Sequence, residues 1–63
     1  MRQATEKDFK CGSSLYDIDG NQFLITHLYS NGIYDVDVYS PSGRRVGSKC
    51  LFVSEAKFYQ VKA

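Results

Sequence analysis

The sequence lacks several features that define common classes of protein. It has no tryptophan, one proline, one histidine and two cysteines among its 63 residues. No apolar run approaches the roughly 18–20 residues that cross a bilayer. The polar segment 1–8 also lacks the apolar stretch of a secretory signal. These absences predict a cytoplasmic chain without membrane contact.

Cysteine and histidine are too few and too widely spaced for a metal site. Cys11 and Cys50 lack the C-x₂₋₄-C spacing of zinc ligands, and His27 is the only histidine. In a reducing cytoplasm we expect two free thiols, with a disulfide between them as the alternative. Cys50 lies in an apolar segment, which favours an inert, buried thiol. His27, in phase with Phe23 and Ile25, is expected to be a partly buried strand residue.

The length of the chain argues against an enzyme. A domain of 63 residues buries only about 60% of the surface that its unfolded chain exposes. Enclosing a ligand cavity of roughly 300–1,000 Å³ would hollow out such a core. We therefore expect one domain spanning residues 1–63, no catalytic residues, no cofactor, and a function located on the surface.

Two acidic motifs are better explained by structure than by chemistry. In the run 17–21 glycine stands fourth, whereas a calcium-binding EF-hand loop needs it sixth, so a tight turn is expected instead. Asp35 and Asp37 project from one face of a strand, at the spacing of paired catalytic carboxylates. Without a cleft around them, we interpret them as solvent-exposed charges.

Glycine-bearing turns punctuate the chain every 11 or 12 residues, at Gly20, Gly32 and Gly43. The segments between them are rich in tyrosine, valine, isoleucine and phenylalanine, which is typical of short antiparallel strands. Asn31-Gly32 is a strong hairpin signal, and Gly47 marks a bulge. The expected strands are 15–18, 22–29, 33–39, 45–53 and 58–62.

Short helical turns are expected at both ends of this meander. Residues 1–12 form an N-terminal arm or helical turn, in which Thr5 and Asp8 resemble a capping arrangement and Phe9 anchors the arm to the core. Ser54 caps a second helical turn, over residues 54–57, just before the last strand.

This order of elements resembles a small barrel of the Src-homology-3-like kind. The resemblance implies an all-β fold, with five short antiparallel strands in a small bent barrel. The strings 5–9, 15–21 and 54–59 are similar to short uncharacterised bacterial and prophage-type proteins, which implies a bacterial or mobile-element origin. The tryptophan and the Ala-Leu-Tyr-Asp-Tyr motif of peptide-binding Src-homology-3 domains are missing, so binding of proline-rich peptides is not implied.

Charge is distributed unevenly along the chain. Residues 11–43 hold four aspartates and no lysine or arginine, whereas residues 44–63 hold five basic residues and one acidic residue. Three interpretations are open: pairing of acidic and basic strands across the sheet, a charged contact with a protein, or a basic patch for nucleic acid. The sequence pI of about 7.8 lies below the value above 9 typical of nucleic-acid modules.

We expect a small non-catalytic protein–protein interaction module or accessory protein. It would bind a protein partner, or a second copy of itself, through exposed tyrosines and charged faces or by adding a strand to an open edge. The alternative is a nucleic-acid-binding barrel with a basic patch around the third turn. The candidate partner-binding residues are Tyr39, Arg44, Arg45 and Lys49.

Overall fold

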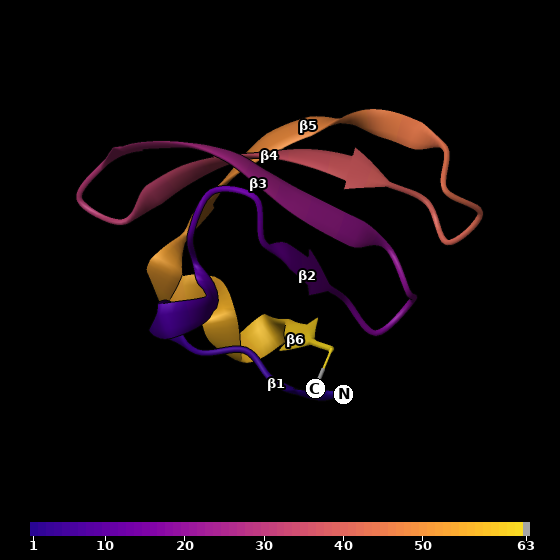
Figure 1. Ribbon diagram of the computed structural model, residues 1–63, viewed down its shortest axis with the longest axis horizontal. Helices are drawn as coiled ribbons and strands as arrows, with labels where there is room; N and C mark the ends of the chain where they lie inside the picture. Colours follow the sequence, from indigo (N-terminus) through magenta and orange to yellow (C-terminus); the bar gives the residue numbers. More distant parts are fainter. Residues whose placement is uncertain (63) are drawn as a thin grey trace.

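A computed structural model describes residues 1–62, which form one antiparallel sheet with two short 3₁₀ segments (Figure 1). The elements are β1 (Arg2–Gln3), η1 (Glu6–Asp8), β2 (Ser14–Tyr16), β3 (Gln22–Ser30), β4 (Ile33–Tyr39), β5 (Arg45–Phe52), η2 (Val53–Phe58) and β6 (Gln60–Val61). The strand order is β1-β6-β2-β3-β4-β5. The prediction of an all-β antiparallel chain is confirmed, with six strands in place of five. Within residues 1–62, no helix is long and apolar enough to cross a bilayer.

The additional strand is β1, in the segment expected to be an arm or a helical turn. Arg2 lies opposite Val61, and Gln3 lies opposite Gln60. The Ala4 N–H extends this pairing by donating to the Tyr59 carbonyl at 3.0 Å. Strand β6 is shorter than predicted because η2 continues through Phe58. The first and last strands along the chain, β1 and β6, are therefore neighbours in the sheet.

The two sharpest predicted turns have the expected geometry. Asn31 and Gly32 both have positive φ, at 50° and 78°, as a type I′ hairpin requires. Asp17 accepts the backbone N–H groups of Asp19 and Asn21 at 3.0 and 2.9 Å. This confirms a turn at residues 17–21 and explains the concentration of short polar side chains there.

Bulges interrupt the long strands. The β3–β4 register shifts between Ile25 and His27, which leaves His27 exposed, so the prediction of partial burial was wrong. On β5, Val38 lies opposite Gly47 and Tyr39 lies opposite Arg45, so Val46 is the extra residue. The bulge predicted at Gly47 is confirmed.

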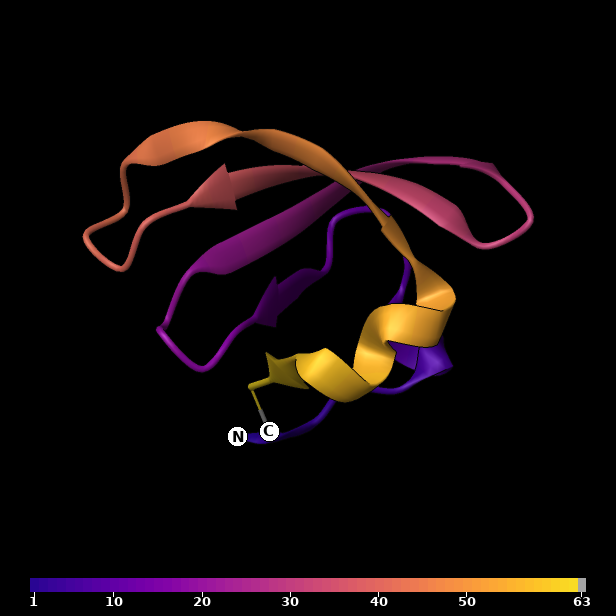
Figure 2. The ribbon, with the colours of Figure 1, turned by 180° about the vertical axis from the view of Figure 1, so that it is seen from behind.

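The core lies beneath the curved layer of β3, β4 and β5, which β1, β2, β6 and the 3₁₀ segments cover on one side (Figures 1 and 2). Its fully buried side chains come from four successive strands: Leu15, Ile25, Val36 and Leu51. Phe9 is 4% exposed and its ring packs edge-on against Tyr34 at 5.3 Å. The predicted anchoring of the N-terminal segment by Phe9 is confirmed.

Carboxylates cap both 3₁₀ segments. Thr5 N–H donates to Asp8 at 2.8 Å, which confirms the predicted capping at η1. At η2 the prediction of Ser54 as the cap was wrong, because the segment begins one residue earlier. The Phe52 N–H donates there to the Glu55 carboxylate at 3.2 Å.

Candidate functional site

Tyr39 and Arg45 lie together beside the third turn. They are directly opposite each other on β4 and β5, so their side chains share the outer face of the sheet. Arg44 is exposed in the turn itself. The Arg45 guanidinium contacts Asp37 at 3.1 Å, with 55% of the Arg45 side chain exposed. Acidic and basic strands therefore do pair across the sheet, through a surface ion pair of about 0–1 kcal/mol.

Lys49 lies on the other face of the same sheet. It is opposite Val36, which is fully buried, and its ammonium lies 5.8 Å from the centre of the Phe23 ring. The Val46 bulge places Lys49 on the face opposite to Arg45, because in a regular strand residues 45 and 49 would share a face. The structure thus brings three of the four candidate residues together and separates Lys49 from them.

Strand β5 forms a long open edge of the sheet, at the end of the strand order. The Val53 N–H donates to the Gly32 carbonyl at 2.8 Å and continues the β4–β5 register. Hydrogen-bonded and non-hydrogen-bonded pairs alternate in an antiparallel ladder. Ser48, Cys50 and Phe52 therefore direct their backbone N–H and C=O groups away from β4, and we call this segment the β5 edge.

Side chains along the β5 edge are accessible. Cys50 is exposed, so the prediction of a buried thiol was wrong: its side chain lies on the outer face, opposite Asp35. Phe52 and Val46 are 50% and 59% exposed. The other end of the sheet, β1, offers an edge of only two residues.

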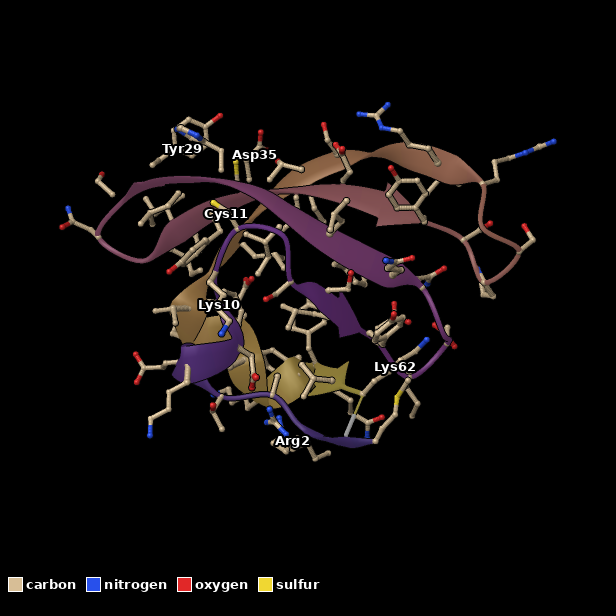
Figure 3. All side chains as sticks on the ribbon, viewed as in Figure 1. Arg2, Lys10, Cys11, Tyr29, Asp35 and Lys62 are labelled. Atoms are coloured by element: carbon tan, nitrogen blue, oxygen red, sulfur yellow. The ribbon has the colours of Figure 1, made fainter. Side chains whose placement is uncertain are left out.

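A polar cluster on the outer face was not predicted. The Tyr29 hydroxyl donates to the Asp35 carboxylate at 3.4 Å (Figure 3). The His27 and Tyr29 rings meet edge-on, with their centres 4.7 Å apart. The negative charge of Asp35 raises the pKa of Tyr29. Bulges on both sides of this segment set its side-chain directions, and the sequence pattern carries no sign of them. Among residues 1–62, no three His, Cys, Asp or Glu side chains gather closely enough to hold a metal ion.

A surface cavity of about 300 Å³ lies where β1, β2 and β6 meet. Its lining residues are Arg2, Asp8, Ser13, Ser14, Tyr16, Val61 and Lys62. Arg2 and Asp8 form a two-point ion pair at 2.8 and 3.0 Å, and the Lys62 ammonium lies 5.2 Å from the centre of the Tyr16 ring. Sequence reasoning missed this site because its residues come from both ends of the chain.

Comparison with protein-family models, with curated proteins and with solved structures finds no match. The function proposed for this chain therefore depends on its own residues. Two features stand out on its surface: the β5 edge and the cavity between β2 and β6.

Proposed function

We propose that this protein is a non-catalytic protein-binding module that adds an extended segment of a partner protein to the β5 edge. The observation that carries the proposal is the outward direction of the backbone groups of Ser48, Cys50 and Phe52. An unpaired edge of this kind is a template for another strand, and main-chain hydrogen bonds then supply the affinity.

The charge around the β5 edge favours an acidic partner. Arg45 lies on the outer face and Lys49 on the inner face, and β5 contains no acidic residue. Acidic side chains on the inner face of an added strand would meet Lys49, while apolar side chains would meet Val46 and Phe52. On the outer face Arg45 is already paired with Asp37, so the preference for acidic residues is expected on the inner face. A second copy of this chain fits less well, because pairing two β5 edges would bring like charges together.

Exposed edges are also a hazard, and β5 carries two protections against aggregation. A bulge distorts its first part at Val46, and Lys49 places a charge in its middle. The regular stretch that remains, Ser48–Phe52, is short. We therefore expect a weak complex whose affinity falls as salt concentration rises.

Selection from a peptide library tests the proposal. The probe is a displayed library of eight-residue segments, the length of β5, drawn from Asp, Glu, Thr, Val and Ile. A matched library carries Lys and Arg in place of Asp and Glu. Selected acidic peptides should slow the hydrogen exchange of the Ser48, Cys50 and Phe52 amides. No enrichment, or equal enrichment from the basic library, would sink the proposal.

Two variants at one position provide the control. Cys50→Pro removes the outward N–H without breaking a bond to β4, since Pro is tolerated where the N–H side of an edge strand faces solvent. Cys50→Thr keeps that N–H. We expect the selected peptides to bind Cys50→Thr and to lose binding to Cys50→Pro at unchanged circular dichroism. Equal binding to the two folded variants would contradict strand addition.

The finer class of the fold belongs to the same proposal. The order of elements, the 3₁₀ turn directly before the last strand and the strong curvature of β3–β5 (Figure 2) support a small bent barrel of the Src-homology-3-like kind. A solution structure would test it through contacts between β1 and β5. If β1 and β5 made no contact in that structure, the sheet would be open and the barrel assignment would be wrong.

Nucleic-acid binding near the third turn is the second hypothesis. The neighbouring Tyr39 and Arg45, with Arg44 exposed beside them, support it. Asp37 on the same face and Lys49 on the opposite face argue against it. Replacing Arg44 and Arg45 together with Ala should abolish any salt-sensitive gel shift with single-stranded or double-stranded oligonucleotides. Absence of any shift for the unmodified protein at low salt would exclude this hypothesis.

A further inference from the structure

Strands β2 and β6 separate after a single pair, Tyr16 opposite Gln60. The Asp17 N–H donates to the Asn21 carbonyl on the β3 side at 3.2 Å. By alternation, Tyr16 and Ser14 direct their backbone groups towards β6. Two positions further along the β2–β6 ladder Ser14 would lie opposite Lys62, but the register ends before it. The cavity of about 300 Å³ opens at this point, and we call it the β2–β6 gap.

Hydrogen-bond donors predominate among the side chains of the gap. The Ser14 hydroxyl accepts a bond from the Gln22 amide at 2.8 Å, which leaves its own proton for another acceptor. Ser13 contributes a second hydroxyl, and Lys62 contributes an ammonium with three donors. A ligand that fits this set must supply acceptors.

Among the lining residues within 1–62, the one carboxylate of the gap, Asp8, is already compensated. Both oxygens of Asp8 accept from Arg2, at 2.8 and 3.0 Å, and one of them also accepts the Thr5 N–H at 2.8 Å. The Arg2 and Asp8 charges offset each other. The Lys62 ammonium, which lies 5.2 Å from the Tyr16 ring centre, therefore gives the gap a net positive charge.

We propose that the β2–β6 gap binds the oxyanion group of a small organic molecule, with Lys62, Ser13 and Ser14 as donors. The gap is larger than a bare phosphate or carboxylate and lies at the lower end of the range for small-molecule sites. The Tyr16 ring provides the apolar surface that packs against the body of the ligand. The site is independent of the β5 edge, so either can fail without the other.

Titrations of ¹⁵N-labelled protein at low ionic strength test the proposal, with phenyl phosphate, benzoate and inorganic phosphate as probes. We expect saturable shifts of the Ser13, Ser14 and Lys62 amides, with at least one of the two organic anions binding more tightly than inorganic phosphate. The tighter of the two identifies a phosphate or a carboxylate as the preferred group. No saturable shift with any probe, or tightest binding of inorganic phosphate, would overturn the proposal.

Lysine variants show whether the gap is responsible. Lys62→Gln should weaken binding about tenfold, the effect of losing one charge-assisted hydrogen bond. Lys57→Gln is the matched control, because the Lys57 ammonium also lies over an aromatic ring, Phe58, at 5.4 Å, but outside the gap. Ser14→Ala should weaken binding as well, with β2 intact. An equal loss in Lys57→Gln and Lys62→Gln would show non-specific charge attraction and refute the site.

Discussion

Arg2 and Asp8 join the first strand to the first 3₁₀ turn through two parallel hydrogen bonds, Nη2 to Oδ1 at 2.8 Å and Nη1 to Oδ2 at 3.0 Å. Two-point pairing of this kind is stronger and more directional than a single contact. It holds β1 where β6 can pair with it, and it also forms one wall of the β2–β6 gap. Stability and the candidate ligand site therefore depend on the same two side chains.

Acid should weaken this link. The hydrogen bonds from Arg2 lower the pKa of Asp8 to about 2, from an ordinary value of 3.8. A carboxyl group with a lowered folded-state pKa adds stability that is complete above pH 4 and disappears as the pH falls towards 2. We expect the midpoint of thermal unfolding to drop over this interval. Asp8→Asn should show a smaller drop over the same range, and an identical acid profile in Asp8→Asn would contradict this role.

Leu51 should be the most sensitive core position on β5. It is fully buried opposite Tyr34, so Leu51→Ala should cost about 2–5 kcal/mol in the free energy of unfolding, measured with urea. Because a domain of this size retains only about 3–5 kcal/mol in total, the variant should be largely unfolded. Leu28→Ala removes the same atoms from a side chain that is 48% exposed. It should stay folded, and similar losses in the two variants would contradict the observed core.

Two glycine turns should respond differently to alanine. At Gly32 (φ 78°) an added Cβ would approach Val53 Cγ1 to 2.7 Å, whereas at Gly43 (φ 91°) it would meet nothing within 4 Å. Both substitutions carry the strain of positive φ, about 1–3 kcal/mol, and only Gly32→Ala adds a clash. The loss in urea stability should be larger for Gly32→Ala. The reverse order would show that the β3–β4 turn does not pack against η2.

Both cysteines should react readily in the folded protein. Cys11 and Cys50 are exposed free thiols, so a thiol reagent such as Ellman's reagent should titrate two groups without denaturant. Cys50→Ser should remove one of the two. If only one thiol reacted in the folded protein and the second reacted only in denaturant, Cys50 would be buried, as the sequence pattern predicted.

Local patterns in the sequence were sufficient to predict the strands and turns at the centre of the sheet. Strand β4 was predicted at its observed bounds, because Tyr34, Val36 and Val38 alternate with Asp35 and Asp37 between two clear turn signals. Both faces of 22–29 are apolar, so nothing in that pattern indicated the bulges near His27 and Tyr29.

The ends of the chain and the candidate sites depend on contacts that no local pattern contains. Strand β1 is two polar residues with no alternation, and it forms only because Val61 and Gln60 lie beside it. The uneven charge pointed to the third turn, where Arg44 and Arg45 lie, and a binding surface there stays a prediction. The bulge at Val46, however, places the Arg45 and Lys49 side chains on opposite faces of the sheet. The gap beside Ser14 depends on where β2 and β6, which are distant in sequence, separate.

The position of β1 also sets the order in which the strands are expected to pair. Strands β2 to β5 pair with partners close in sequence, whereas β1 pairs with β6, on the far side of all of them. Contacts between segments close in sequence form faster than contacts that must first close a long loop. We therefore expect the β1–β6 pairing, and with it one wall of the β2–β6 gap, to form after the hairpins of β2 to β5 during folding.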